Sequence, residues 1–404
     1  MRIRRCAIVY LEPREEVAFD LNSLLDGGAG LRRSRRWLAV TAHLDGEVEV
    51  DARQREWLGR IGPVAWCERD ELPEHEHEHE RALDLAAIDR LLELGLLIAQ
   101  DQPAYAAQRE RDEAVRGAYW WPAAAIAHRF GRWQGMDSAA AMEAGQMSTA
   151  AEIRKKLGAP PPHVVERCAP QQRQALPRAE DGEFERLLAR RATCRNFDGA
   201  RALPQALFAR MLQRVFAARA QVRVQDDTVF LKKLTPSGGG LHATEAYLIV
   251  QNVEGVAAGL YHYHPTEHAL EPMPPPSQPL AEFAALALAG QHWFADAPVL
   301  AVLAPRYARS FWKYRDHAKA YRALVLDVGH LSQTLYLSAT ELELGAFVTS
   351  AINEVDIERA FGLDPLVEGP LAICGFGWRA ERMRTAEFDP AGAVWTRIGE
   401  AGQD

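Results

Sequence analysis

The stretch Thr235-Pro-Ser-Gly-Gly-Gly-Leu-His242 runs directly into Ala243-Thr-Glu-Ala-Tyr-Leu-Ile-Val250, so that a glycine-rich turn leads into an apolar strand. Three consecutive glycines let the backbone approach a flat ligand and expose N–H donors, and Ser237 adds a hydroxyl. The stretch is neither a G-x-G-x-x-G fingerprint nor a P-loop, because no Lys-Ser or Lys-Thr pair follows it. Taken alone, it is more typical of a plain turn into a strand.

The sequence on either side of this stretch predicts alternating helices and strands. Helices are expected over 184–191 and 207–215, and a long, mostly apolar helix over 318–344. Strands are expected over 246–250, 299–304, 346–349 and 371–375. A helix that is apolar on nearly every face must be buried on every face. The alternation predicts an α+β or α/β layered domain of about 200 residues.

The chain before residue 183 differs from the rest in composition and hydrophobic pattern, and we divide it into three parts. Residues 1–100 combine short apolar runs with a helical pattern that ends at Gly95, which predicts a small α/β module. Residues 101–157 are rich in Ala, Glu, Arg and Met, and predict a helical segment cut by glycine and proline. Residues 158–182 are rich in Pro, Gln and Arg and predict a linker, so the layered domain is assigned to 183–404.

Composition restricts the class of protein. With 404 residues, 48% hydrophobic and 25% charged, the chain is globular and long enough for two or three domains. A formal charge of −8 provides no basic surface for nucleic acid. Five scattered cysteines without a C-x-x-C pair argue against a disulfide framework or a thiolate zinc site, and they favour a reducing cytoplasm. Neither a secretion signal nor a membrane-spanning run is expected, and the alternating His and Glu of 74–80 are interpreted as a solvated loop rather than a metal site.

A second chemical motif is Arg190-Arg-Ala-Thr-Cys-Arg195, directly after the helix expected over 184–191. Side chains two apart in an extended segment point the same way, so Arg191, Thr193 and Arg195 can converge on one phosphate. An arginine-rich helix end is more often a solvated C-cap, so this motif is not specific by itself.

A third motif, Phe311-Trp-Lys-Tyr-Arg315, precedes the long helix. Adjacent Lys313 and Tyr314 offer a proton-transfer pair, because burial and mutual influence can move their pKa values toward neutrality. Within the helix, Asp327 and His330 lie three residues apart on one face. A histidine in such a helix is more often a hydrogen-bonded core residue than a catalyst.

Together these motifs resemble the nitroreductase superfamily, and within it the SagB-type dehydrogenases that mature ribosomally synthesised peptides. The resemblance covers roughly 183–378, about half of the chain. It rests on R-x-[S/T]-x-R, P-S-G-G-x-L-H with E-x-Y, G-L-Y-x-Y, K-Y with Y-R, G-H and E-G-P-L, which begin in that order at Arg191, Pro236, Gly259, Lys313, Gly329 and Glu368. The fold it implies is a nitroreductase-like α+β domain, with a central, mainly antiparallel sheet flanked by helices. The N-terminal module would then be winged-helix-like or similar to leader-peptide-recognition modules.

The resemblance implies FMN as the cofactor. The R-x-T-x-R loop would hold its phosphate and ribityl chain, and the P-S-G-G segment would lie beside its ring. Backbone N–H groups for the reactive flavin nitrogen would come from Ser350 and Ala351, where many relatives carry Glu-Gly. The cofactor-binding residues implied in this way are Arg191, Thr193, Arg195, Pro236, Ser237, Gly238, Gly239, Ser350, Ala351, Gly375 and Arg379.

The resemblance also implies a reaction. Lys313 and Tyr314 match the Lys-Tyr pair that acts at the substrate in azoline-oxidising SagB-type enzymes, so both are implied as catalytic residues. The substrate would be a modified ribosomal peptide whose thiazoline or oxazoline is oxidised to an azole, with hydride transfer to FMN. A cytoplasmic homodimer is implied, with a cyclase or other maturation enzymes as further partners. Nucleic acid, a membrane and a metal are not expected.

Two other functions remain open at this stage. One is an NAD(P)H-dependent nitroreductase-like FMN reductase, which would use the same cofactor residues. The other is a flavin-free scaffold that binds a peptide through the N-terminal module.

Overall fold

The computed structural model describes residues 1–72, 77–390 and 392–395. The chain divides into two compact units. Unit 1 comprises Met1–Gly131 and Tyr307–Tyr321, and unit 2 comprises Arg132–Arg306 with the chain from Arg322 onward. The chain therefore leaves unit 2 after Arg306 and rejoins it at Arg322.

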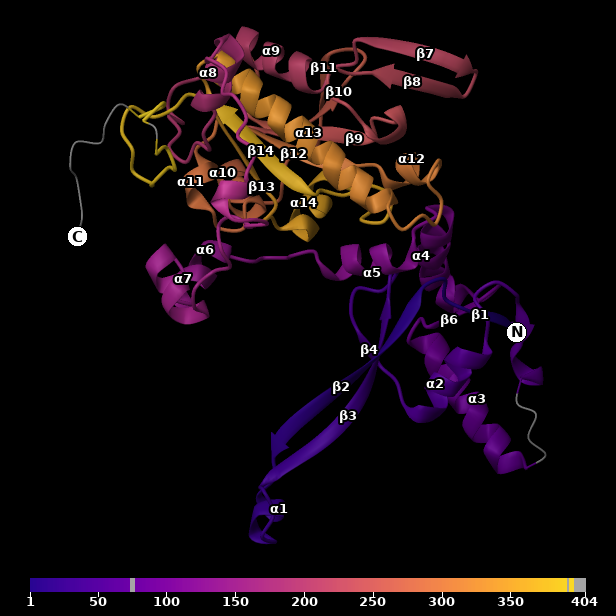
Figure 1. Ribbon diagram of the computed structural model, residues 1–404. Helices are drawn as coiled ribbons and strands as arrows, with labels where there is room; N and C mark the ends of the chain where they lie inside the picture. The colour runs from indigo at the N-terminus through magenta and orange to yellow at the C-terminus, as the bar shows by residue number, and fades with distance from the viewer. Residues whose placement is uncertain (73–76, 391, 396–404) are drawn as a thin grey trace. The chain divides into compact units, whose positions relative to one another are not determined.

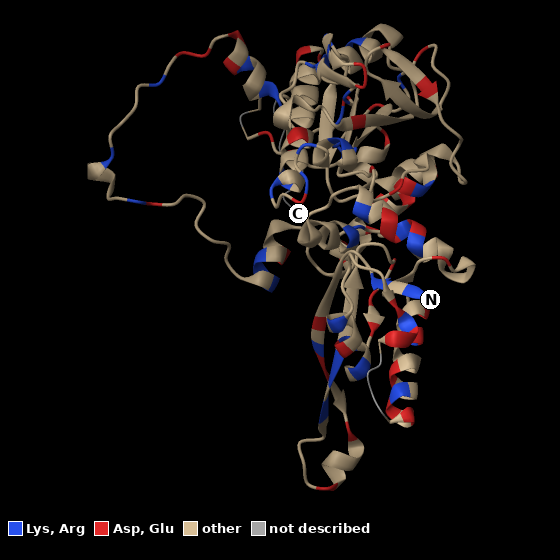
Figure 2. Ribbon diagram, turned by 90° about the vertical axis from the view of Figure 1, so that its right-hand side faces the viewer, with Lys and Arg blue, Asp and Glu red and all other residues tan. Residues whose placement is uncertain are grey.

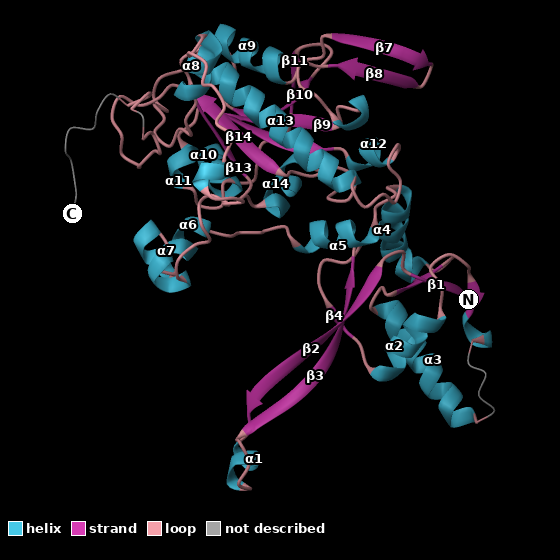
Figure 3. Ribbon diagram, in the orientation of Figure 1, coloured by secondary structure: helices cyan, strands magenta, loops and turns pink. Residues whose placement is uncertain are grey.

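Unit 2 is built on one six-stranded antiparallel sheet (Figures 1 and 3). Its strand order is β11 (Ala269–Pro272), β10 (Gly259–His264), β9 (Thr244–Val250), β12 (Val299–Pro305), β14 (Ala372–Gly377) and β13 (Gly345–Thr349). Every neighbouring pair in this order is antiparallel. The α+β class with a mainly antiparallel sheet is thus confirmed, and the four expected strands are β9, β12, β13 and β14.

Helices cover both faces of this sheet because the side chains of its strands alternate between two apolar cores. One core joins Leu248, Ala301 and Cys374 to α9 (Gln205–Val215) and α13 (Ala320–Glu341). The other joins Ile249, Val302 and Ile373 to three shorter helices, α10 (Leu280–Ala287), α11 (His292–Ala295) and α14 (Glu354–Phe361). Strands apolar on both faces are what this layering requires.

Helix α13 is the long apolar helix expected over 318–344, but it is not buried on every side. Leu324, Val328 and Leu331 are buried, whereas Val325 and Leu326 are 49% and 58% exposed. The exposed positions recur at helical spacing, so one stripe of the helix faces away from the sheet. The expectation of burial all round therefore does not hold within a single chain.

The remaining elements of unit 2 lie outside these layers. They are α6 (Ser138–Ala144), α7 (Ala150–Leu157), the 3-10 turn η3 (Pro170–Gln172), α8 (Glu183–Arg190), the hairpin β7 (Ala220–Gln225) and β8 (Thr228–Lys232), and the 3-10 turn η4 (Gly238–Gly240). Residues 158–182, which were predicted to be a linker, are exposed throughout.

Unit 1 contains a small three-stranded sheet in which β1 (Arg2–Arg5) lies between β5 (Cys67–Glu68) and β6 (Leu97–Ala99). Helices α2 (Ala52–Arg60) and α3 (Glu78–Glu93) pack on it through one apolar core. Its other elements are the 3-10 turns η1 (Arg69–Glu71) and η2 (Pro103–Tyr105) and the helices α4 (Ala106–Gly117), α5 (Pro122–Phe130) and α12 (Tyr307–Phe311).

A long hairpin is the largest feature of unit 1 that the sequence did not predict. Strands β2 (Val9–Phe19) and β3 (Leu31–Thr41) pair over eleven residues, and the short helix α1 (Leu21–Leu25) closes the hairpin. β4 (Val48–Glu49) extends the sheet at β3. Arg35–Glu15 and Arg36–Glu16 ion pairs cross between the strands, and Figure 2 shows the mixed charges along the hairpin. Charged residues on both faces leave no apolar alternation to recognise.

The returning segment Tyr307–Tyr321 is part of the core of unit 1. Trp120, which is 2% exposed, contacts the rings of Tyr307, Phe311 and Tyr321 at centroid distances of 4.7, 4.8 and 5.7 Å. The Tyr321 hydroxyl also lies 3.2 Å from His128 Nδ1. Aromatic packing therefore holds this segment in unit 1.

Candidate functional site

The P-S-G-G turn is fastened to helix α13 by Asp327. The Ser237 hydroxyl donates to Asp327 Oδ2 at 2.6 Å, and the Gly238 N–H donates to Asp327 Oδ1 at 2.9 Å. Ser237 Oγ also accepts from the His242 N–H at 2.9 Å. The Ser237 side chain is therefore committed to holding the turn, and the exposed backbone of the turn is what a ligand can meet.

The glycines of this turn are required by its geometry. Gly239 and Gly240 have φ values of +65° and +69°, in the left-handed region that favours glycine. A Cβ atom on Gly238 would lie 3.2 Å from the Cβ of Ala323 on α13, which is a tight contact. These residues let the turn lie close against the helix, and Pro236 precedes them as an exposed residue.

A small cavity beneath the turn is lined by a buried lysine, Lys233. Lys233 and Thr244 are 4% and 3% exposed, and with Pro236 and Ser237 they line a space of about 10 Å³, enough for about one water molecule. The Thr244 hydroxyl has no hydrogen-bond partner among the described residues. Burial lowers the pKa of Lys233, although the nearby Glu245 carboxylate opposes that shift.

The arginine motif forms an extended loop after α8 that pairs with β13. Thr193 forms a parallel bridge with Ala346, and the Cys194 N–H donates to the Ala346 carbonyl at 2.8 Å. The Thr193 hydroxyl lies 3.0 Å from the hydroxyl of Tyr336 on α13, and the Arg191 guanidinium lies 5.3 Å from the centre of the same ring. Tyr336 was not singled out in the sequence, because a tyrosine within an apolar helix reads as core.

Arg195 and Arg379 lie on the other side of this loop, so the side chains of Arg191, Thr193 and Arg195 do not converge on one point as their spacing predicted. The guanidinium of Arg195 is 6.0 Å from the ring centre of Phe294. Arg379 follows β14, donates to the Ala192 carbonyl at 3.2 Å, and forms an ion pair with Glu387 at 2.6 Å. Arg379 therefore already has two protein partners.

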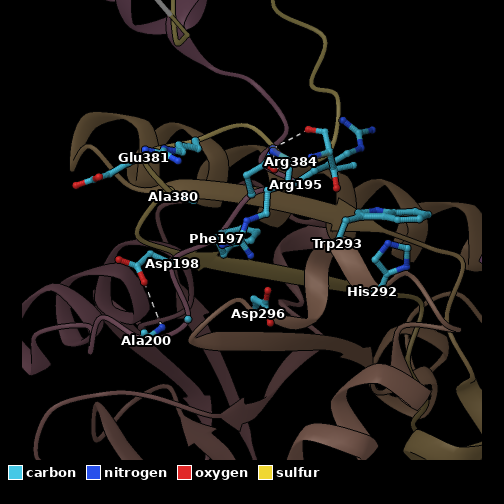
Figure 4. A pocket seen from close by; sticks show the side chains of 14 residues that line it. Arg195, Phe197, Asp198, Ala200, His292, Trp293, Asp296, Ala380, Glu381 and Arg384 are labelled. Atoms are coloured by element: carbon cyan, nitrogen blue, oxygen red, sulfur yellow. Dashed lines mark hydrogen bonds between the residues drawn. The ribbon is translucent and has the colours of Figure 1, made fainter. Parts of the chain in front are cut away.

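A cavity of about 780 Å³ opens beside Arg195 (Figure 4). Arg382, Arg384 and His292 also line it, and Figure 4 shows Arg384 beside Arg195 with Trp293 close by. The indole N–H of Trp293 is buried and has no acceptor among the described residues. Guanidinium groups are suited to binding a phosphate, but the carboxylates of Asp198, Asp296 and Glu381 line the same cavity and offset the charge of its three arginines. Arg382 and Arg384 were missed because no periodicity marks the segment that follows β14.

Ser350 and Ala351 follow the end of β13. The Ala351 N–H donates to the Thr349 hydroxyl at 3.2 Å, and the Ala351 carbonyl accepts from the Gln291 amide at 2.6 Å. No acceptor is found within the described chain for the N–H of Ser350, which is exposed. The Ser350 N–H is thus available as a donor at the predicted position. The hydrogen bonds of the neighbouring Ala351 hold the turn in place.

Gly375 lies inside β14, opposite Phe347 of β13. A Cβ atom there would fall 2.1 Å from Cε1 of the Phe347 ring. That ring is fully buried and stacks on Phe294 with a centroid distance of 3.9 Å. The structure therefore gives Gly375 a packing role whether or not a cofactor touches it.

Lys313 and Tyr314 lie in the segment that belongs to unit 1, directly after α12. Lys313 is exposed and Tyr314 is half-buried, with the Lys313 ammonium 5.5 Å from the Tyr314 ring centre. The backbone N–H groups of both residues donate to the Ser310 carbonyl at 3.2 Å. The two side chains are thus neighbours on one turn.

The E-x-Y and G-L-Y-x-Y motifs meet within the sheet, where Tyr247 of β9 is paired with His262 of β10. Glu245 Oε1 accepts from Arg306 Nε at 2.8 Å, and His262 Nδ1 lies 2.6 Å from Glu271. Hydrogen bonding to Glu245 raises the pKa of His262. These two motifs therefore form one charge network.

Helix α13 connects the two loops predicted to bind the cofactor. The P-S-G-G turn bonds to Asp327 and the arginine loop to Tyr336, nine residues further along, which is about 13 Å at 1.5 Å per residue. Tyr336 Oη also accepts from the Val348 N–H at 3.1 Å, two residues before Ser350. The P-S-G-G turn and the Arg191–Thr193 part of the arginine loop thus contact one helix, whereas Arg195, Gly375 and Arg379 contact other elements.

The layered antiparallel sheet is that of an α+β domain of the nitroreductase type. The nitroreductase family model matches residues 188–378. The putative nitroreductase MJ1384 of Methanocaldococcus jannaschii is 30% identical over 207 residues, which cover 51% of this chain and 96% of that protein. The chain belongs to the nitroreductase family.

Two further similarities are more limited. The trifolitoxin-processing protein TfxB of Rhizobium leguminosarum bv. trifolii is 30% identical over 147 residues, which cover 35% of this chain but only 38% of that protein. A chain of the E. coli microcin synthetase McbBCD complex with truncated pro-MccB17 bound is 19% identical, with a TM-score of 0.47, and the match covers 67% of this chain and 94% of that one.

The described residues contain neither a cluster of metal ligands nor a helix that could span a membrane. Across 1–72, 77–390 and 392–395, no group of three or more His, Cys, Asp or Glu side chains is placed to hold a metal ion, and residues 74–76 of the His-Glu tract lie outside these ranges. In the same part of the chain, no helix combines the length and apolar character needed to cross a bilayer.

Proposed function

We propose that the chain is an FMN-dependent dehydrogenase that oxidises a thiazoline or oxazoline of a ribosomally synthesised peptide to an azole. The observation that carries this proposal is the presence in one chain of a family-typical cationic loop and an adjacent Lys313-Tyr314 pair. A simple reductase needs the first feature but has no evident use for the second.

In this proposal, the phosphate end of FMN is held by Arg195, which lines the cavity of about 780 Å³, while Arg191 and Thr193 lie on the other side of the loop and contact Tyr336. Arg382 and Arg384 add positive charge in the cavity beside Arg195. At the other end, the backbone of Gly238 and Gly239 would lie along the ring, with the Ser350 N–H as a donor to it. Arg379 and Gly375 would also shape the loop and the sheet, because Arg379 donates to the Ala192 carbonyl and Gly375 leaves room for the Phe347 ring.

The bound cofactor would supply the chemistry of a two-electron acceptor. The chain's own part is to hold the azoline ring and take its proton, which we assign to Lys313 with Tyr314 beside it. One C–H bond of the ring loses its hydrogen as a proton and the neighbouring C–H loses its hydrogen as a hydride, so the ring gains a double bond. Molecular oxygen would then accept the electrons.

The peptide class is supported by similarity to TfxB, whose name describes the processing of trifolitoxin. The small α/β module of residues 1–100 would bind the substrate's leader segment, and a cyclase that makes the azoline would act before this enzyme. The exposed stripe of α13 with Val325 and Leu326 supports a homodimer, because a second copy would bury the apolar side chains that one chain leaves exposed.

The test begins with the absorption spectrum of the purified protein and identification of any released chromophore. Turnover of an azoline-containing peptide is then compared for the wild type, Lys313→Met, Tyr314→Phe and the control Lys319→Met, an exposed lysine of the same segment. Loss of the proton-transfer pair should lower turnover at least about a hundredfold, while the control remains active. Equal turnover in all variants would exclude the assigned role.

The same preparation separates this proposal from a reductase. Rapid bleaching of the flavin by NADPH, with no azoline oxidation, would favour an NAD(P)H-dependent FMN reductase. The relative MJ1384 carries the name of a putative nitroreductase. A colourless protein that binds no added FMN would favour a peptide-binding scaffold.

A further inference from the structure

Glu387 is a carboxylate buried within the segment that follows the last strand. Its side chain has no exposed area, and each of its two carboxylate oxygens accepts two hydrogen bonds. One oxygen accepts from the Arg195 N–H at 2.6 Å and from the Asn196 side-chain amide at 2.9 Å. The other accepts from Arg379 at 2.6 Å and from the Trp395 indole at 2.9 Å. Four donors from three parts of the chain thus converge on one side chain.

The same segment is joined to the arginine loop by Asn196, which is 5% exposed. Asn196 Oδ1 accepts from the N–H groups of Arg384 and Thr385 at 2.7 and 2.8 Å, and its Nδ2 donates to the Thr385 carbonyl at 2.7 Å. Further along, Asp389 accepts from the N–H of Trp395 at 2.9 Å and thereby places the indole that Glu387 needs. We call residues 380–390 and 392–395 the C-terminal clamp.

Burial of Glu387 is costly unless all its partners are present. Burial alone would raise the pKa of the Glu387 carboxyl, but hydrogen bonds from Arg195, Trp395 and Asn196 hold it below its usual range. A buried charge that loses one partner is strongly unfavourable, so the network forms or breaks as a unit. The loop and the clamp are therefore coupled through one residue.

We infer that Glu387 is a positioning residue that locks the C-terminal clamp onto the loop Ala192–Asn196 and so presets Arg195, together with Arg382 and Arg384 of the clamp, for an incoming phosphate. This inference rests on the proposed function. Glu387 touches no ligand atom in this role: it acts through the backbone of Arg195 and through Arg379, which in turn holds the Ala192 carbonyl. The clamp also carries Arg382 and Arg384, so the same lock places two of the cavity's cations.

A competing account predicts the opposite change in FMN affinity when Glu387 is replaced. Glu387 could instead be a stand-in for phosphate that occupies Arg379 and keeps the cofactor out. Its removal would then strengthen FMN binding, because a negative charge disappears and Arg379 becomes available. The positioning account predicts weaker binding, because the loop loses its preset shape.

The decisive variant is Glu387→Gln in the full-length protein. An amide keeps one acceptor oxygen, but its NH₂ must face either Arg379 and Trp395 or Arg195 and Asn196, and all of these are donors. The control is Glu358→Gln, which removes a buried charge that pairs with Arg132 elsewhere in unit 2. FMN affinity is measured by flavin fluorescence, at a temperature where all variants are folded.

Trypsin provides a second readout that needs no flavin. Arg382 and Arg384 are exposed residues of the clamp, so a released clamp is cut faster at both. For Glu387→Gln, we expect cleavage of the flavin-free protein to accelerate about tenfold and the FMN dissociation constant to rise about tenfold, equivalent to about 1.4 kcal/mol. Glu358→Gln should change neither value.

Each alternative outcome has one meaning. Tighter FMN binding by Glu387→Gln overturns the positioning role in favour of competition with phosphate. Unchanged cleavage overturns the clamp, whatever the flavin result. If the wild type binds no FMN but cleavage still accelerates, the clamp on the loop stands and the proposed function fails.

Discussion

Replacing Gly375 with alanine adds one methyl group where the sheet has no room for it. The new Cβ would lie 2.1 Å from Cε1 and 2.8 Å from Cζ of Phe347, whereas carbon atoms prefer about 3.5–4.0 Å. The ring would have to move by about 1.5 Å to relieve the closest contact. It cannot do so easily, because it stacks on Phe294 at a centroid distance of 3.9 Å with 8° between the planes, and both rings are buried.

Overpacking of this kind costs about 1–3 kcal/mol, and the lack of space around Phe347 favours the upper half of that range. At about 2–4 °C per kcal/mol for a domain of this size, Gly375→Ala should lower the melting temperature of unit 2 by about 4–12 °C. The measurement is a thermal melt of the flavin-free protein by near-ultraviolet circular dichroism, repeated by urea denaturation.

Phe347→Leu supplies the matched test of the cause. A smaller side chain at 347 removes the obstacle, so the double variant should be less unstable than the sum of the single variants by about 1–2 kcal/mol. A Gly375→Ala protein that melts like the wild type, or strict additivity in the double variant, would refute the packing argument. Weaker FMN binding at unchanged stability would show instead that Gly375 is needed for the cofactor.

The remaining predictions concern α13 and the cavity beneath the P-S-G-G turn. Asp327→Ala leaves Ser237 and Gly238 without their acceptor and should cost about 2–3 kcal/mol in urea denaturation, against about 1 kcal/mol for Ser237→Ala. Because the pKa of Lys233 is lowered in the folded state, the wild type should gain stability as pH rises from neutral to about 10, the range in which the unfolded chain still holds that proton. Lys233→Met should have a larger free energy of unfolding than the wild type at neutral pH, and the difference between the two proteins should shrink as pH rises. A difference that stays constant with pH would contradict the lowered pKa of Lys233. Leu326→Lys should turn a dimer into a monomer in sedimentation velocity, while Gln333→Lys on the same exposed stripe tests for a mere charge effect.

The layered part of the fold was predictable because its signals are local. The strands 246–250 and 299–304 are apolar on both faces, which is the pattern of a sheet covered by helices on two sides. The helix over 318–344 was recognised by its length and composition. Its exposed stripe was not, because Val325 and Leu326 look the same in the sequence as the buried Leu324 and Val328.

The site was predictable only where a motif concentrates unusual residue types. Arg191 and Thr193 could be named from their spacing, but their partner Tyr336 lies 143 residues from Thr193 and belongs to an apolar helix. Glu387 lies in a segment without periodicity, and its importance comes from four donors that only the folded chain brings together. Long-range polar partners leave no trace in a local pattern.

The path of the chain through unit 1 has a consequence for its synthesis. The ring of Trp120 is made early, but its neighbours Tyr307, Phe311 and Tyr321 emerge only after about 175 to 190 further residues have been added beyond Gly131. At about 5–20 residues per second, the ribosome needs about 10–40 s to supply them. During that interval the N-terminal unit is without part of its core, so its final closure must wait until most of the sheet of unit 2 has been translated.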